Sequence, residues 1–234
     1  MLKLHNIAYS YDRRAKALDA LSAEIADGVT LLAGPNAGGK TTLLRLLAGL
    51  LEPGSGHIVL RDRPVDSLRL RQISRMVMQD ADPQILAARV GDDVMLGEKS
   101  SNLKDGFEKR ARELSASFGL GDFWDQPVHS LSYGQKRKLC LVHAMAAGPE
   151  MLLLDEPFAG LDYPSGRELR HFIRENKRNG LRQIISTHEL EPVFDLADRV
   201  VVVVDGRVPA EGAPEEMRDR LERWSIRKPG GGWT

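Results

Sequence analysis

A glycine-rich loop with the sequence GPNAGGKT occupies residues 34–41, between a short apolar run at Thr30–Ala33 and a leucine-rich helix that begins at about Lys40. The loop fits the pattern G-x-x-x-x-G-K-[ST] in the strand, loop and helix order that binds nucleotide phosphates. Its glycines let backbone N–H groups approach phosphate oxygens, and the helix N-terminus adds a positive dipole end. The segment predicts an α/β domain that binds a nucleoside triphosphate; the competing interpretation is a chance glycine-rich turn.

The last residues of this loop are expected to act on the phosphates and on a metal ion. Lys40 places a positive charge on the β- and γ-phosphates, and the Thr41 hydroxyl can bind Mg²⁺. The residues expected to contact ATP here are Gly34, Pro35, Asn36, Ala37, Gly38, Gly39, Lys40, Thr41 and Thr42.

Two adjacent acids follow the apolar run Met151–Leu154. A carboxylate at the carboxyl end of a buried strand lies beside the phosphate loop of an open α/β sheet. Asp155 is therefore predicted to hold Mg²⁺ through water, and Glu156 to activate the attacking water as a general base. The alternative is a pair of solvated acids that start a turn before Pro157.

Apolar strands alternate with helical stretches in the second half of the chain. The strand candidates are Met151–Leu154, Arg182–Ser186 and Arg199–Val204, and the helical stretches lie at about 164–178 and 189–197. This alternation indicates a parallel sheet covered on both faces. The stretch from about 80 to 147 is instead polar and helical, with a charged amphipathic helix at Lys104–Phe118. The pattern is that of an α/β core split by a helical insert.

The composition narrows the classes of function. Lys plus Arg and Asp plus Glu each total 33 of 234 residues, which argues against nucleic-acid binding driven by net charge. The only cysteine, Cys140, has apolar neighbours and is expected to be buried rather than reactive. The N-terminus lacks a signal-peptide core, and the apolar runs are too short to span a membrane. We therefore expect a cytosolic protein that serves a membrane, if at all, from its surface.

The segment Leu131–Gln135 reads LSYGQ, and it resembles the signature motif L-S-G-G-Q of ABC ATPases, with Tyr133 in place of the first glycine. The family's motifs also follow in order: the phosphate loop, Gln79, the signature, the acid pair, Asp162 and His188. The resemblance implies a P-loop NTPase core with a mostly parallel sheet, N-terminal antiparallel β strands and an inserted α-helical subdomain. It implies one domain, with the core at 1–79 and 148–227, the helical subdomain at about 80–147, and a flexible tail at 228–234.

In this family the signature motif completes the site of another subunit. Ser132, Gly134 and Gln135 lie at the start of a helix, which is an anion site that a chain with its own phosphate loop does not need. The resemblance implies that they contact the γ-phosphate on a second ATPase subunit, identical or paralogous, in a head-to-tail dimer. Taken alone, Ser132 would be an ordinary helix N-cap.

The resemblance assigns roles to four more residues. Gln79 is expected to sense Mg²⁺ and the γ-phosphate, and His188 to contact the γ-phosphate. Asp162 is expected to couple the two sites across the dimer, and Tyr11 to stack on adenine, with Tyr9 as the competing candidate. The alternatives are a surface glutamine and a structural histidine.

The phosphate loop departs from the family at two positions, where Ala37 and Gly38 replace the usual Gly and Ser. If position 37 needs a positive φ, alanine costs about 1 kcal/mol there, without loss of ATP binding.

Residues 79–97 resemble the energy-coupling-factor importers, through a second glutamine, Gln84, after Gln79 and a V-x-x-D-V segment at 90–94. This resemblance implies uptake of a vitamin or transition-metal ion, a transmembrane coupling protein as partner, and a peripheral place on the cytoplasmic face of the membrane. Candidates for the groove that receives the membrane protein are Ile85, Leu86, Val90, Val94 and Met95. The alternative is that most of these form the core of the helical insert.

Other functions stay open at this stage. The chain could power another ABC importer or an exporter, or act outside transport, for example in iron–sulfur cluster assembly. A nucleotide switch without turnover is disfavoured by the carboxylate of Glu156.

Overall fold

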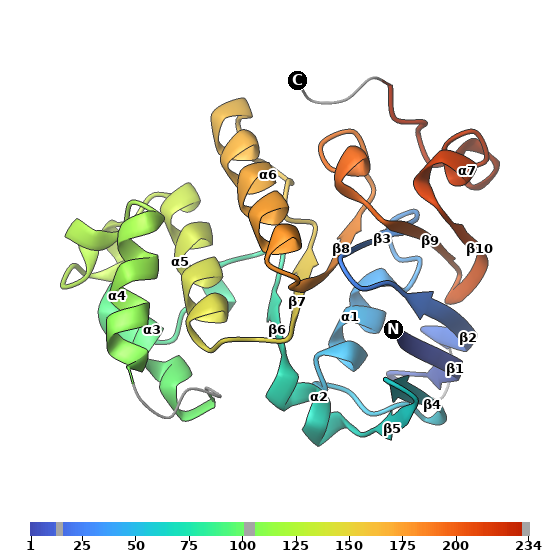
Figure 1. The fold of residues 1–234 in the computed structure, drawn as a ribbon, viewed down its shortest axis with the longest axis horizontal. Coiled ribbons are helices and arrows are strands. Elements are labelled where there is room, and N and C mark those ends of the chain that lie inside the picture. Colours follow the sequence, from blue (N-terminus) through green and yellow to red (C-terminus); the bar gives the residue numbers. More distant parts are fainter. Residues whose placement is uncertain (13–15, 101–105, 231–234) are drawn as a thin grey trace.

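A computed structural model describes residues 1–12, 16–100 and 106–230, and it folds into two sheets and a helical layer (Figure 1). The first sheet is antiparallel, in the order β2-β1-β4-β5. The strands of this sheet are β1 (Leu2–Tyr9), β2 (Leu18–Ile25), β4 (Ser55–Leu60) and β5 (Arg63–Val65). The α/β fold class with N-terminal antiparallel strands is thus confirmed.

The second sheet has the order β10-β9-β3-β8-β7-β6 and is parallel except for the β9–β10 pair. Its strands are β3 (Val29–Ala33), β6 (Ser74–Val77), β7 (Met151–Asp155), β8 (Arg182–Thr187), β9 (Arg199–Val204) and β10 (Arg207–Gly212). Strands β3, β7 and β8 are buried along their whole length. Burial of β7 follows from its apolar run, whereas β8 also buries polar residues at both ends.

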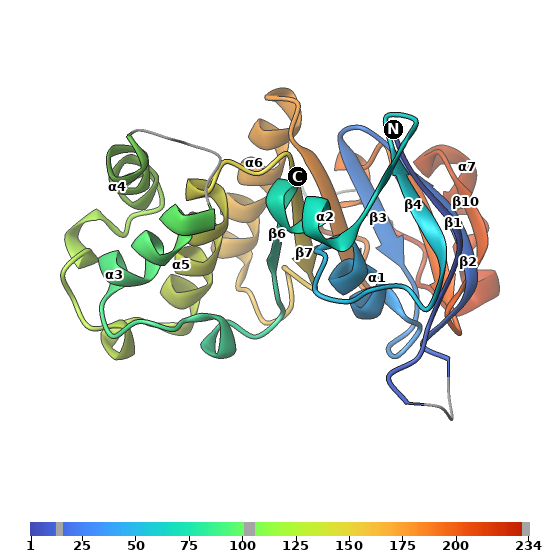
Figure 2. The same ribbon diagram turned by 90° about the horizontal axis from the view of Figure 1, so that it is seen from below.

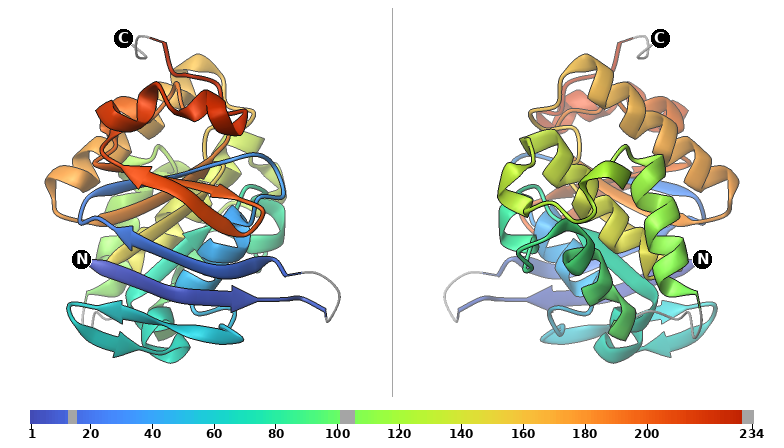
Figure 3. Two further views of the ribbon diagram at one scale, coloured as in Figure 1. Left: turned by 90° about the vertical axis from the view of Figure 1, so that its right-hand side faces the viewer. Right: turned by 90° about the vertical axis from the view of Figure 1, so that its left-hand side faces the viewer.

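Helices cover the second sheet and extend beyond it. The helices are α1 (Lys40–Leu47), α2 (Ser67–Ile73), α3 (Val90–Met95), α4 (Phe107–Ser117), α5 (Tyr133–Ala146), α6 (Tyr163–Arg178) and α7 (Pro214–Arg218). Short 3₁₀ turns lie at Asp82–Gln84, Leu96–Ser100, Gly121–Phe123, Val128–Ser130, Phe194–Leu196 and Leu221–Trp224. Helices α3, α4 and α5 form a layer at the end of the molecule opposite the antiparallel sheet (Figures 2 and 3).

Three apolar clusters hold these layers together. One lies between the antiparallel sheet, α1 and the second sheet, and one packs α5 and α6 against the other face of the second sheet. The third is confined to the helical layer around Val90, Trp124 and Leu139. The helical layer thus has a core of its own, and its helix α5 also packs on the second sheet.

The prediction of a helix at about 189–197 is wrong, since this stretch contains only the 3₁₀ turn Phe194–Leu196. Pro192 lacks an N–H group, and Val193 has a non-helical φ of −141°. The predicted helix at Lys104–Phe118 is present as α4, but residues 104 and 105 lie outside the described part of the chain.

The described part of the C-terminal segment contacts the rest of the chain. Lys228 forms an ion pair with Asp219, and the Gly230 N–H donates to Glu191. Residues 231–234 of the expected tail lie outside the described residues. No helix in the described ranges has the length and apolarity needed to cross a bilayer.

Candidate nucleotide site

The loop at residues 34–39 joins β3 to α1 under tight steric limits. A Cβ on Gly34 or Gly38 would lie 2.1 or 2.7 Å from the carbonyl oxygen of Val203. Gly39 precedes α1 with a φ of 108°, a conformation that suits glycine. Ala37 has a φ of 62°, so position 37 does need the left-handed conformation, and alanine is strained there as expected.

Lys40 begins α1 and points back into the loop. Its ammonium donates to the carbonyls of Gly34 at 2.8 Å and Pro35 at 3.0 Å, and it lies 3.7 Å from a carboxylate oxygen of Glu156. Burial lowers the pKa of the Lys40 ammonium, while the carboxylates of Glu156 and Asp155 act in the opposite direction. The lysine, the loop and the acid are therefore gathered in one buried site.

Asp155 and Thr41 meet at the carboxyl edge of the sheet. The Thr41 hydroxyl lies 3.1 and 2.9 Å from the two Asp155 carboxylate oxygens, and the Ser186 hydroxyl also donates to Asp155. A hydroxyl beside a carboxylate is a hard oxygen donor set, which suits Mg²⁺ held together with nucleotide phosphates. This chemistry fits the metal that the phosphate loop requires.

Glu156 is held at both its backbone and its side chain. Its φ is 46°, and its N–H donates to the Ser186 carbonyl at 3.0 Å. One carboxylate oxygen lies 3.0 Å from Nδ1 of His188, which is exposed on its far side. The structure thus brings together Lys40, Glu156 and His188, three residues far apart in the sequence.

Tyr11 lies beside the first turns of α1. Its hydroxyl is 3.3 Å from the Thr42 hydroxyl and accepts from Arg45 at 3.1 Å, while 56% of the residue is exposed. Tyr9, the competing candidate, is partly buried against the apolar cluster of the antiparallel sheet. The geometry therefore favours Tyr11 as the ring available to a purine base.

The signature residues belong to the helical layer instead. Ser132 and Gln135 form a capping box at the start of α5, where the Ser132 side chain accepts from the Gln135 N–H at 3.3 Å and its N–H donates to the Gln135 side chain at 2.8 Å. Figure 1 shows α5 and α1 on opposite sides of β6 and β7. The chain's own phosphate loop and its own signature motif are thus carried by separate layers.

Asp162 and Gln79 lie in loops beside these elements. Asp162 is exposed and caps α6, and hydrogen bonds from Ser165 lower the pKa of its carboxyl. Gln79 is exposed just after β6, where the side chain of Gln84 bonds the Met78 N–H at 3.0 Å and the Asp80 carbonyl at 2.8 Å. The second glutamine of the sequence pattern therefore shapes the loop that carries Gln79.

The sequence did not single out Ser186 or Arg137. Ser186 could have been found, because it is a polar residue at the carboxyl end of a buried strand, directly paired with Asp155. Arg137 gave no such signal, since its partners are all backbone carbonyls. Cys140 is buried as expected, and burial raises the pKa of its thiol to about 12.

A phosphate loop, a buried lysine and two consecutive acids at the carboxyl end of β7 define a P-loop ATPase. Residues 18–159 match the family model described as ABC transporter. The cobalt import ATP-binding protein CbiO of Rhodobacter capsulatus is 38% identical over 98% of this chain and 85% of that protein. The chain belongs to the ABC transporter family, as an ATPase subunit.

Two further comparisons agree with this membership. The energy-coupling factor transporter ATP-binding protein EcfA of Methanocaldococcus jannaschii is 32% identical over 97% of this chain and 84% of that protein. The solved structure of cbiO1 from Clostridium perfringens, described as part of the ABC transporter complex cbiONQ, is 32% identical with a TM-score of 0.81. It covers 97% of this chain and 94% of that chain.

We expect Ala37→Gly to raise the free energy of unfolding by about 0.5–1 kcal/mol, because glycine relieves the left-handed strain but is more flexible when unfolded. Denaturant unfolding of the two proteins measures this difference. Ala33→Gly, in the neighbouring strand β3, is the matched control and should destabilise the chain, because it removes buried contacts and adds the same flexibility to the unfolded chain without relieving strain. Equal destabilisation by both substitutions would show that position 37 carries no strain.

Proposed function

We propose that this chain hydrolyses ATP with Mg²⁺ to power uptake of a transition-metal ion or vitamin by an importer of the energy-coupling-factor type. The supporting observation is the joint placement of Lys40, Asp155 and Glu156 at the ends of adjoining elements. The similarity to a cobalt import protein and to energy-coupling-factor proteins supports the transport part. We also propose the division into a core at 1–79 and 148–227, a helical subdomain at about 80–147, and a tail at 228–234.

In the proposed site the loop residues 34–39 and the N-terminus of α1 cradle the phosphates, with Lys40 on the β- and γ-phosphates and Tyr11 on adenine. Thr41, Asp155 and Gln79 hold Mg²⁺, which neutralises the phosphate charge when bound. Glu156 accepts a proton from the attacking water. His188 lies 3.0 Å from the Glu156 carboxylate, and it orients this carboxylate and contacts the γ-phosphate.

A second subunit, identical or paralogous, is proposed to complete each site head to tail. Ser132, Gly134 and Gln135 would reach the γ-phosphate on that partner, and Asp162 would couple the two sites. Gly134 has open space around its backbone. A Cβ placed there would have no described heavy atom within 4 Å, apart from the adjacent residues and the backbone of its own helix. An uncovered helix start with a capping serine is a surface that an external anion can approach.

The membrane partner is proposed to bind beside the loop of Gln79. Of the five apolar candidates for this groove, Val90 and Val94 are fully buried in the helical layer, and Ile85 and Met95 are packed against its core.

Leu86 differs from the other four candidates, because 76% of it is exposed. Its N–H donates at 2.7 Å to the buried carboxylate of Asp93, which also accepts from Ala87 at 3.1 Å. Leu86 is thus an exposed apolar residue on a firmly held backbone, which suits contact with a transmembrane coupling protein.

Replacement of the catalytic acid tests the hydrolytic part. Glu156→Gln should lower the rate of ATP hydrolysis by about 100- to 10,000-fold, because an amide cannot act as a general base, while ATP binding remains. Hydrolysis and nucleotide binding are measured separately on the purified chain. Glu189→Gln, an exposed acid close by on the loop after β8, should leave the rate unchanged. Turnover by Glu156→Gln at the normal rate would overturn the assignment of the base.

The transport part is tested by uptake of radiolabelled Co²⁺, Ni²⁺ or a vitamin into cells that express this chain with the energy-coupling-factor membrane proteins of the same genome. Uptake of one of these solutes should fall to background with Lys40→Ala, because loss of the ammonium abolishes ATP binding. Normal uptake of all of them with Lys40→Ala, or the absence of uptake with the unaltered chain, would contradict micronutrient import.

A further inference from the structure

Arg137 is a buried cation that reaches from α5 to three backbone carbonyls in two loops around the acid pair. Its guanidinium donates to the carbonyl oxygens of Ala159 at 2.6 Å, Gln79 at 3.1 Å and Glu156 at 3.2 Å. Only 8% of the residue is exposed. One side chain of the helical layer therefore holds the loops after β6 and β7 at the same time.

Arg137 donates these hydrogen bonds to main-chain carbonyl oxygens, so they restrain the backbone of the loops. A side-chain partner could follow the guanidinium by changing rotamer, whereas a carbonyl oxygen moves only with its own loop. The planar guanidinium offers five N–H donors in a rigid fork, so it can hold several acceptors at set angles. A shift of α5 must therefore move these loops or break the hydrogen bonds.

Arg137 restrains the backbone of Glu156, the residue proposed as the general base. Glu156 has a φ of 46°, which is strained for a residue with a side chain. Its N–H is held by the Ser186 carbonyl on β8, at 3.0 Å, and its own carbonyl is held by Arg137. Such a conformation persists when the surroundings fix it from both sides. Arg137 supplies one of those two sides.

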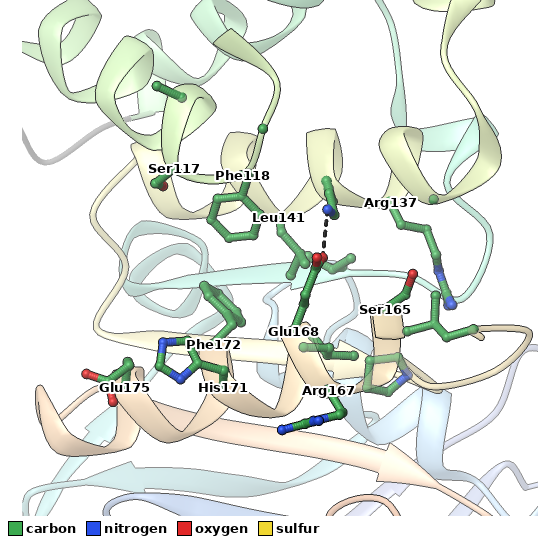
Figure 4. A pocket seen from close by; sticks show the side chains of 18 of the residues that line it. Ser117, Phe118, Arg137, Leu141, Ser165, Arg167, Glu168, His171, Phe172 and Glu175 are labelled. Carbon is green, nitrogen blue, oxygen red and sulfur yellow. Dashed lines mark ion pairs between the residues drawn. The ribbon is translucent and has the colours of Figure 1, made fainter. Parts of the chain in front are cut away.

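Tyr133 covers the same guanidinium. Its ring centroid lies 5.5 Å from the guanidinium carbon of Arg137, within the range of a cation–π contact. Tyr133 is the residue that departs from glycine in the signature motif. Figure 4 shows Arg137 extending from its helix at the edge of a cavity of about 1010 Å³, which also borders Ser165 and Leu141. The guanidinium is thus reachable through this cavity by a small solute.

We propose that Arg137 is a positioning residue for ATP hydrolysis, which fixes the backbone of Glu156 and the loops of Gln79 and Ala159 to the signature helix. When the start of α5 docks on the nucleotide of the second subunit, Arg137 then also sets the orientation of the Glu156 carboxylate in its own chain. The inference rests on the proposed role of Glu156 as general base.

The first test is the kinetics of Arg137→Met. Single-turnover hydrolysis of Mg·ATP should slow by about 10- to 100-fold, because small misplacements of a catalytic group have effects of this size. The Kd for ATP should stay unchanged, since Arg137 donates to no atom of the phosphate loop. Lys138→Met is the matched control, because Lys138 is the next residue and forms an ion pair with Glu168 on α6, at 2.7 Å, away from the loops that Arg137 holds. It should leave both quantities unchanged.

Two variants separate positioning from simple stability. Arg137→Lys keeps a buried cation and should fold with a Tm close to that of the unaltered chain. It should hydrolyse slowly, because a single ammonium nitrogen cannot reproduce the planar fork whose two terminal nitrogens reach both loops. Arg137→Ala should regain activity when guanidinium is added at low concentration, because the cavity admits it. Ammonium should give no such recovery. Full activity of Arg137→Lys, or failure of guanidinium to rescue the folded Arg137→Ala, would overturn the proposal.

A double substitution shows whether Arg137 acts through the base. Arg137→Met should cause no further loss in a Glu156→Gln background, since coupled residues are not additive. An equal fold-loss in both backgrounds would overturn the proposal while leaving the assignment of Glu156 intact. Normal hydrolysis by Glu156→Gln alone would instead overturn that assignment, and this inference with it.

Discussion

The hydrogen bonds between Asp155, Thr41 and Ser186 join the three elements on which the site depends. Thr41 lies on α1, Asp155 ends β7 and Ser186 lies near the end of β8, so one carboxylate fixes a helix start against two parallel strands. The strand ends align because β7 and β8 pair in register at Asp155 and Ser186. The buried core beneath them makes this alignment rigid, and the phosphate cradle and the catalytic acid depend on it.

The helical layer is a second structural unit of the ATPase. It has its own apolar core, and it carries the signature residues at the start of α5, away from α1. Helix α5 also packs against the second sheet through apolar contacts, and polar contacts add to these. Arg137 on α5 donates hydrogen bonds to the loops of Gln79 and Glu156, whereas Asp93 holds the segment of Leu86 within the helical layer itself. A movement of α5 would therefore act on the loops that Arg137 holds.

The sequence predicted the parts whose signal is local. The phosphate loop, the strand-end acids and the buried strands follow from residue spacing and apolar runs, and the strain at Ala37 followed from its departure from glycine. The helix expected at 189–197 failed because Pro192 interrupts an otherwise helical pattern. Arg137 was missed because its acceptors are main-chain atoms, which leave no trace in the sequence. The roles of the site residues remain predictions.

We propose that each ATP is held by groups from two polypeptides, and a mixture of two inactive variants tests this shared site. Ser132→Arg keeps the cradle and loses the signature, whereas Lys40→Ala keeps the signature and loses the cradle. Each alone should be inactive, and an equal mixture should regain up to about a quarter of the normal hydrolysis rate, since half of the random dimers hold one complete site. Hydrolysis by Ser132→Arg alone at the normal rate would contradict a site shared between two subunits. So would the absence of recovered hydrolysis in a mixture in which mixed dimers form.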